Sequence, residues 1–316
     1  MTLISSNPYR VGRASLVAVT LLSIAALAGA QQPDAGQPQA ASAAQPAPTP
    51  LPPQPAVFHD LIPTDQLGFL ADYDGKMPKD IERDKRFRHI EGLITPNTTY
   101  FYHYDRELSE TRDLMLDEAP MPISVRDGRY VMVASADGPD QHMHGRGFIW
   151  IDMQTGMGLG GVYFKPSNGE PTPTLTIFSK QLTDTYLGMS QLPPEFLVDL
   201  NQWALIARVH STSPRYFIAA NKKKYALIHD GDFCAHAEGT AAPPEDECEE
   251  MNAEAADADL EAAWFMKATG HLSDATAYLL EPEFDAWFVV RQRACGNGVA
   301  CRVVYTRRKT QELLAR

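Results

Sequence analysis

The residues best suited to carry chemistry near the end of the chain are two cysteines, Cys295 and Cys301, which lie six positions apart across a Gly-Asn-Gly turn. The other two cysteines, Cys234 and Cys248, lie fourteen positions apart. Cysteines can perform redox catalysis, bind metal or form structural disulfides, and four of them allow three pairings. Because each of these pairs is close in sequence and brackets a turn, we expect the disulfides Cys234–Cys248 and Cys295–Cys301.

Two histidines, His142 and His144, stand two positions apart in the segment DQHMHGRG, and on a strand both would point to the same side. Such a pair could supply two ligands to zinc or copper. A metal site needs more ligands, and the sequence has neither an H-E-x-x-H motif nor a second cluster of histidine and cysteine. We therefore expect an exposed polar loop and no metal site.

The segment GMGLGG, residues 156–161, has the glycine spacing of a dinucleotide-binding loop. That function needs a helix directly after the glycines, because the helix N-terminus holds the pyrophosphate. Here the glycines run into Val162, Tyr163 and Phe164, which favour a strand, so we expect a hairpin turn and no cofactor. The sequence also lacks the G-x-S-x-G motif of serine hydrolases, and it identifies no catalytic residue.

Acidic side chains are concentrated in one stretch of the C-terminal part. From Glu238 to Glu261 there are ten carboxylates and no lysine or arginine, whereas residues 281–316 hold seven basic and four acidic residues. An ordinary solvated helix face explains such a run, and so does a surface that steers a cationic partner. The candidate partner-binding residues are Glu247, Glu249, Glu250 and Glu254.

The elements that position these residues follow an export sequence. Two arginines precede a short apolar run, and Ala28-Gly29-Ala30 follows it as a small-residue cleavage site, which predicts a signal peptide at residues 1–30. We therefore expect a periplasmic or secreted protein without a membrane anchor, in a compartment where disulfides persist. Residues 31–57 are rich in alanine, proline and glutamine with almost no charge, and are expected to form a disordered linker.

The net charge restricts the class of partner. The whole chain carries −12, and removing the two arginines of the signal peptide leaves −14. Such a charge argues against nucleic acid and against anionic membrane surfaces. It suits a cationic partner, and it gives no information on the oligomeric state.

Residues 58–232 are predicted to form a β-rich domain. Short segments of β-branched and aromatic residues are separated by Gly, Pro, Asn and Asp, which favours an antiparallel sheet. The segment LPPEFLVDLNQWALI, residues 192–206, is expected to form a short helix. The expected strands lie near residues 129–136, 147–153, 160–166, 174–180, 215–219 and 224–229.

Residues 233–316 are predicted to form a small helical domain. A first helix rich in alanine and glutamate should end near Gly270, a second should end at Cys295, and a third should begin at Cys301. Trp287 and Arg291 are four positions apart and are expected to form a cation–π pair in the core. The predicted fold class is therefore α+β, with a β-rich N-terminal domain and a C-terminal helical domain that disulfides staple.

The motifs of this C-terminal region resemble those of the LprI-like lysozyme-inhibitor family of secreted bacterial proteins. In that family a cysteine pair leads into a helix with the pattern D-x-x-L-x-x-x-[YW], and later W-x-x-x-R precedes a cysteine. Phe284 stands where the family usually has glutamine, and the insert between the first two cysteines is looser than the family's short helical segment. The resemblance covers about a quarter of the chain and implies a helical, disulfide-bonded periplasmic module with lysozyme inhibition as its activity. The matching positions, besides the cysteines, are Asp257, Leu260, Trp264, Trp287 and Arg291.

We therefore expect a non-enzymatic periplasmic binding protein whose acidic helix meets a basic lysozyme or another cationic protein. Two alternatives stay open: a cell-envelope enzyme with its site in the β-rich domain, and a structural or adaptor protein of the envelope. Polar side chains that converge in a pocket of the β-rich domain would favour the enzyme.

Overall fold

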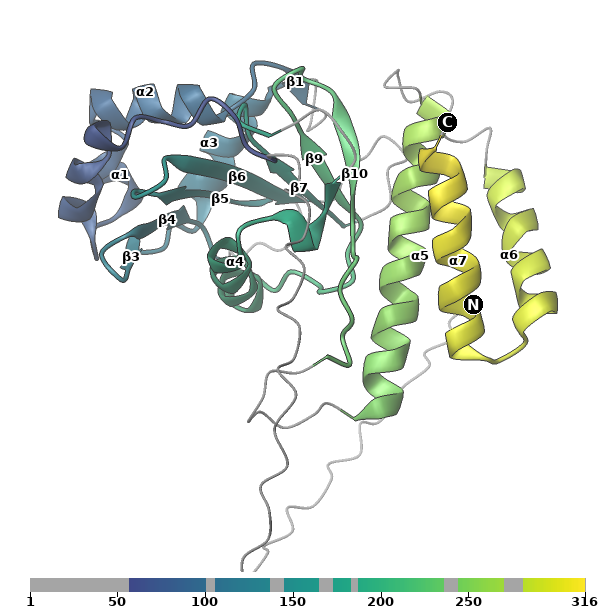
Figure 1. Ribbon diagram of the computed structural model, residues 1–316. Coiled ribbons are helices and arrows are strands. Elements are labelled where there is room, and N and C mark those ends of the chain that lie inside the picture. Colours follow the sequence, from purple (N-terminus) through teal and green to yellow (C-terminus); the bar gives the residue numbers. More distant parts are fainter. Residues whose placement is uncertain are drawn as a thin grey trace, which may run out of the picture. The chain divides into compact units, whose positions relative to one another are not determined.

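The computed structural model describes residues 57–100, 106–136, 145–164, 173–182, 187–235, 244–269 and 281–315 (Figure 1). The chain divides into two compact units, Met1–Pro53 and Gln54–Arg316, and every described residue belongs to the second. The predicted signal peptide lies outside the described residues, as does the predicted linker except for Val57. The boundaries predicted for the two folded domains stay a prediction.

An eight-stranded mixed sheet forms the centre of residues 57–235, which we call the sheet region. The strand order is β3-β4-β5-β6-β7-β9-β10-β8, and neighbours pair antiparallel except β7 with β9 and β8 with β10, which are parallel. A separate antiparallel pair joins β1 (Thr99–Tyr100) to β2 (Arg106–Glu107). The strands of the main sheet are β3 (Ser124–Arg126), β4 (Tyr130–Ala134), β5 (Arg146–Asp152), β6 (Met157–Phe164), β7 (Thr174–Phe178), β8 (Leu187–Gly188), β9 (Arg215–Ile218) and β10 (Lys224–Ile228).

Helices cover both faces of the sheet (Figure 1), and the side chains of β5 alternate between two buried clusters. Ile149 and Ile151 join one buried cluster, in which side chains of α2 and α3 pack, whereas Phe148 and Trp150 join a second cluster with α4. This is the period of two expected for a strand between two apolar layers. The helix α4 (Pro194–Ile206) begins with a proline in its first turn, as the sequence predicted.

Two helices before the sheet were missed by the sequence analysis, α2 (Lys85–Ile94) and α3 (Leu108–Glu118). The short helix α1 (Pro78–Ile81) and the 3-10 turns at Thr64–Gln66, Gly68–Tyr73 and Met189–Gln191 were missed as well. In α3 the polar residues Thr111 and Arg112 occupy buried positions, which hides the helical period of the apolar residues. In α2, by contrast, the buried apolar residues Phe87, Ile90 and Ile94 recur at helical spacing, so the sequence did carry a helix signal there.

The glycine-rich segment at residues 156–161 forms the end of a turn and the start of β6, as expected, and a strand follows it. Gly156 has a φ of +78°, and a Cβ atom there would lie 2.0 Å from the Ile62 carbonyl oxygen. At Gly160 a Cβ atom would lie 2.1 Å from the Phe178 ring. These glycines therefore serve a turn and close packing across the sheet.

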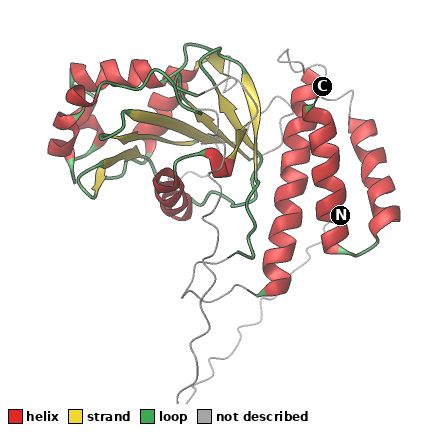
Figure 2. Cartoon of the chain, viewed as in Figure 1, coloured by secondary structure: helices red, strands yellow, loops and turns green. Residues whose placement is uncertain are grey.

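We define the helical region as residues 245–315, and its described residues form three helices (Figure 2). They are α5 (Glu245–Thr269), α6 (Glu281–Cys295) and α7 (Val299–Leu314). The buried side of α5 is rich in alanine, which lets α7 approach it closely. In the part of the chain that the structure describes, no helix has the length and apolar character needed to cross a membrane.

The sheet region and the helical region touch through β9, β10 and α5. Ala262 of α5 lies in one buried cluster with Tyr216, Ala226 and Ile228 of the two strands. The fold class is therefore α+β, as the sequence predicted, with a mixed sheet followed by disulfide-bonded helices.

Candidate partner-binding surface

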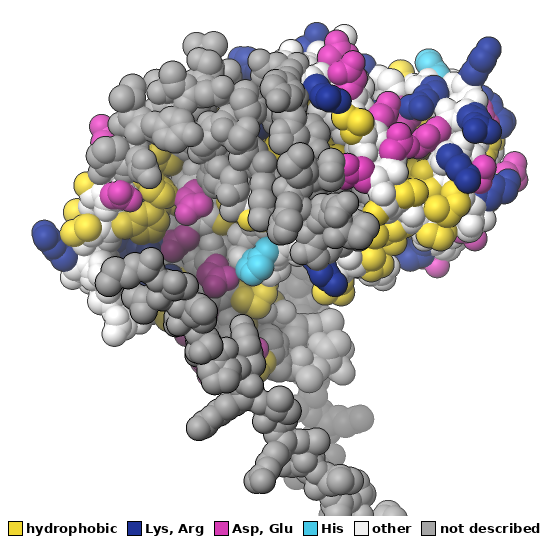
Figure 3. All heavy atoms as spheres, turned by 180° about the vertical axis from the view of Figure 1, so that it is seen from behind, with side chains coloured by type: hydrophobic (Ala, Val, Ile, Leu, Met, Phe, Trp, Pro, Cys, Tyr) yellow, Lys and Arg dark blue, Asp and Glu magenta, His cyan; other side chains and the backbone are white. Residues whose placement is uncertain are grey.

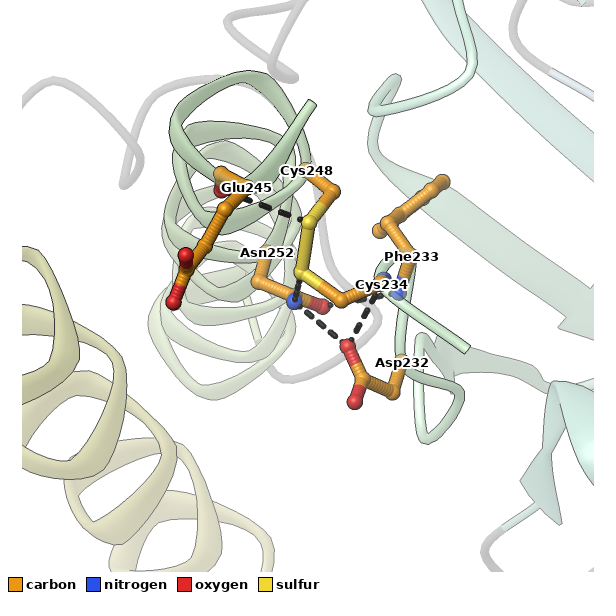
Figure 4. Close-up of a disulfide and its surroundings, with 6 residues drawn as sticks. All are labelled: Asp232, Phe233, Cys234, Glu245, Cys248 and Asn252. Carbon is orange, nitrogen blue, oxygen red and sulfur yellow. Dashed lines mark hydrogen bonds between the residues drawn. A yellow bond between two sulfur atoms is a disulfide. The ribbon is translucent and has the colours of Figure 1, made fainter. Parts of the chain in front are cut away.

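The disulfide Cys234–Cys248 fixes the beginning of α5 to the segment that follows β10 (Figure 4). Its two Cα atoms are 5.0 Å apart. Beside it, the Asp232 carboxylate accepts hydrogen bonds from the Cys234 amide at 2.9 Å and from the Asn252 side chain at 2.7 Å. These bonds, with that from Asn252 first, lower the pKa of Asp232. The start of the acidic helix is therefore held by covalent and polar contacts together.

The second disulfide, Cys295–Cys301, joins the end of α6 to the start of α7, with Cα atoms 5.4 Å apart. Gly296 between them has a φ of +55°, the left-handed conformation expected after a helix end. Both predicted pairings are thus confirmed, and none of the four cysteines is free. Paired cysteines are typical of proteins outside the cytoplasm.

A buried arginine joins the three helices. Arg291 of α6 is 6% exposed, and its Nη1 atom donates hydrogen bonds to the Asp257 carboxylate of α5 and to Thr306 Oγ1 of α7, the latter at 2.8 Å. Its guanidinium also lies 5.4 Å from the Trp287 ring centroid and 4.5 Å from that of Phe288. The expected cation–π pair of Trp287 and Arg291 is therefore present. We call these five residues the Arg291 cluster.

The remaining motif residues lie in the small core of the helical region. Leu260 is fully buried, and Trp264 and Trp287 are half-buried against it. Phe284, which stands where the family usually has glutamine, packs edge-on against Trp264 with ring centroids 5.3 Å apart. All five residues of the resemblance thus contribute to packing or internal charge pairing, and they position the helices that carry the acidic residues.

The structure divides the four glutamates predicted as a partner-binding face. Glu250 pairs with Arg302 of α7 at 2.9 Å, and Glu254 accepts a hydrogen bond from Thr212 of the sheet region at 3.2 Å. The side chains of Glu247 and Glu249 are exposed, and neither carboxylate forms a hydrogen bond or ion pair with any other described residue. Half of the predicted face is therefore used inside the protein.

Two further carboxylates extend the exposed half. Glu245 and Asp246 are also exposed in the first turn of α5, next to Glu247. Negative charge is favourable at a helix N-terminus because it complements the helix dipole. Figure 3, which shows the molecule from behind, shows acidic side chains interspersed with basic and apolar ones on that face. We call Glu245, Asp246, Glu247 and Glu249 the acidic end of α5.

A buried histidine–aspartate pair was missed by the sequence analysis. His229, at the end of β10, places its Nδ1 atom 2.6 Å from an Asp259 oxygen on α5, and its backbone amide donates to the same carboxylate at 2.9 and 3.1 Å. Both residues are at most 5% exposed. Thirty positions separate the two residues, so no local spacing in the sequence could have paired them. The signal for a buried polar contact was the position of Asp259 among the alanines of the helix.

No group of three or more His, Cys, Asp or Glu side chains in the described ranges could hold a metal ion. The histidines at 142 and 144 lie outside the described residues. Comparison of the chain with protein-family models, with curated proteins and with solved structures finds no match. The resemblance to the LprI-like family therefore depends on the motif residues alone.

Proposed function

We propose that this protein is a non-enzymatic periplasmic or secreted binding protein whose helical region captures a cationic protein, with a basic lysozyme as the first candidate. The observation that carries the proposal is the acidic end of α5. Four exposed carboxylates lie within five residues there, and in the described part of the chain no basic side chain pairs with them. Like charges at this spacing repel one another, so a cationic partner would relieve the repulsion.

The rigid support of this surface favours a binding role. The Cys234–Cys248 disulfide closes at the second turn of the helix, directly among the four carboxylates. A surface fixed before it meets its partner loses less conformational entropy on binding. Exposed charges mainly raise the rate of association, because they attract an oppositely charged partner before contact. Added salt shortens the distance over which this attraction acts.

The choice of a lysozyme as partner comes from the motif resemblance. The Arg291 cluster supplies the structural part of that motif in this chain, and lysozymes that attack bacterial walls are typically strongly basic. The periplasmic or secreted location is supported by the two disulfides and by the composition of the first thirty residues.

The test uses the oxidised full-length protein and a basic lysozyme, with association followed by surface plasmon resonance and lysis by turbidity of cell walls. Changing Glu245, Glu247 and Glu249 to Gln and Asp246 to Asn should slow association at least about tenfold at low salt and much less at 1 M salt. Dissociation should change little, because steering acts on the approach.

A matched variant controls for net charge. Asp65→Asn, Asp72→Asn, Asp127→Asn and Asp74→Asn remove the same number of charges from the sheet region and should leave association within about twofold. Equal slowing by both variants would show that only net charge acts. If the folded wild-type protein neither binds nor inhibits any basic lysozyme at low salt, the proposed function is wrong.

A further inference from the structure

A cavity of about 400 Å³ lies at one side of the sheet, where α4 and the turn after it meet the start of β9 and the end of β10. Most of its lining is apolar, from Leu175, Leu197, Leu200, Ala204, Val209 and Phe233. The volume is at the small end of the range of about 300–1,000 Å³ that is typical of small-molecule pockets. It is a pocket of the sheet region, separate from the acidic end of α5.

One cation, Arg215 at the start of β9, forms part of the cavity wall. Its Nη2 atom donates to the Ser211 carbonyl oxygen at 2.6 Å, whereas its Nε atom is buried and makes no hydrogen bond to any described residue. Burial lowers the pKa of Arg215 to about 10 and the charge of Asp259 opposes this, so the side chain stays protonated at neutral pH. The guanidinium therefore brings a positive charge to a pocket whose lining is mostly apolar.

The carboxylate whose charge acts on Arg215 is that of Asp259, and it already accepts hydrogen bonds from another residue. Asp259 accepts the backbone and ring N–H groups of His229, as described above, and forms no hydrogen bond with Arg215. His229 also lines the cavity, and its buried Nε2 atom has no hydrogen bond of normal geometry to a described residue. Burial and Arg215 lower the pKa of His229, while Asp259 and the Ser211 carbonyl act in the opposite direction.

These contacts define the kind of ligand that fits. A largely buried cation without a hydrogen-bonded anion is unfavourable, and a carboxylate is the small anion whose geometry matches a guanidinium. The apolar walls match a hydrocarbon body and disfavour a hydrated ion. A single arginine with Asp232 and Asp259 nearby also disfavours a doubly charged phosphate.

We propose that this cavity binds a small molecule that carries one carboxylate on an apolar body. The carboxylate accepts hydrogen bonds from Arg215, and the body lies against the apolar side of α4. His229 lines the same cavity, but its ring N–H is donated from Nδ1 to Asp259, so its Nε2 atom offers the carboxylate no donor and Arg215 alone holds the charge. This site is independent of the proposed capture of a cationic protein, so either proposal can fail without the other.

Calorimetric titration of the oxidised full-length protein with octanoate tests the proposal. We expect saturable binding of one octanoate per chain. Octanol shares the apolar body and lacks the charge, and it should bind at least about tenfold more weakly, because it cannot form charge-assisted hydrogen bonds with Arg215. Inorganic phosphate, which has charge and no apolar body, should not compete with octanoate.

Variants then locate the site. Arg215→Gln should weaken octanoate binding at least about tenfold. Leu205, which lines the cavity and is 82% exposed, offers a change that leaves the core intact: Leu205→Asp should repel the carboxylate and weaken binding about fivefold or more. Val198, exposed on the same helix and outside the cavity lining, provides the matched control, and Val198→Asp should change binding less than twofold.

Three results would overturn the proposal: no saturable octanoate binding to the folded protein, octanol binding as tightly as octanoate, or equal effects of Leu205→Asp and Val198→Asp. The comparison of Leu205→Asp with Val198→Asp tests the location of the site even if Arg215→Gln does not fold, because Leu205 and Val198 both lie on the surface of α4.

Discussion

The sheet region and the helical region bury very different side chains. In the sheet region the fully buried positions include Trp150, Trp203, Phe148 and Phe196, which fill the side of the sheet that α4 covers with large rings. On α5 the buried positions are mostly alanine, and the largest buried side chain of α6 is the charged Arg291. Apolar burial scales with the area removed from water, so the sheet region gains far more from it.

The helical region compensates with specific bonds. The Cys295–Cys301 disulfide and the Arg291 cluster lie within it, and the Cys234–Cys248 disulfide ties its first helix to the sheet region. Its second helix in sequence, α6, leaves the side chains of Val289 and Val290 half exposed. A small helical unit with a thin core commonly depends on such cross-links. The two neighbouring regions are therefore stabilised by different interactions, and each should be destabilised by different substitutions.

The largest effect is expected at the Arg291 cluster. Arg291→Met keeps most of the side-chain volume and leaves Asp257 without its main partner, which should destabilise the helical region by about 3–5 kcal/mol. Hydrogen exchange read by mass spectrometry should show loss of protection in α5, α6 and α7 before β4 to β7. Arg308→Met, at a side chain that is 81% exposed, is the control and should cost less than about 0.5 kcal/mol. Equal loss of protection in the central strands would show that the Arg291 cluster stabilises both regions alike.

Removing the disulfides should have the next largest effect, in an order set by loop length. Because the longer loop constrains the unfolded chain more, changing Cys234 and Cys248 to Ser should cost about 3 kcal/mol and changing Cys295 and Cys301 about 2 kcal/mol. Urea unfolding followed by circular dichroism at 222 nm measures both values. The reverse order would show that native contacts around the second disulfide matter more than the entropy of the unfolded chain.

The smallest effect concerns a partly buried glutamate. Burial, with the charge of Asp257 beside it, raises the pKa of Glu261 from 4.5 to about 7. Between these two values the unfolded chain releases the proton while the folded protein keeps it, so stability falls as pH rises from about 4.5 to about 7 and then stays level.

Glu261→Gln removes that pH dependence and should therefore stabilise the protein by about 1–2 kcal/mol at pH 8, with little change at pH 4. Thermal unfolding at both pH values measures the difference. Glu249→Gln, at an exposed glutamate, is the control: its stability should differ from that of the wild type by the same small amount at both pH values. A stability that rises between pH 5 and 7 in the wild type, and equally in Glu261→Gln, would show that other groups control this range.

The strands were predictable because their signal is local. β4 to β7, β9, β10 and α4 all lie where alternation, aromatic content and turn residues placed them. The two disulfides were predictable for the same reason, since each joins cysteines that are close in sequence. Helix α3 was not predicted, because buried polar side chains such as Thr111 and Arg112 interrupt its apolar pattern. Helix α2 was missed although Phe87, Ile90 and Ile94 recur at helical spacing.

The sequence by itself thus determined the α+β class, most strands, the helical C-terminal part and the covalent links within it. Only the tertiary structure decided which charges are free. It directs Glu250 and Glu254 to partners at Arg302 and Thr212, leaves Glu247 exposed, and places Arg215 at a cavity beside the His229–Asp259 pair. The physical reason is that spacing along the chain fixes neighbours within a helix or turn, whereas burial and ion pairing depend on which surfaces of distant elements come together.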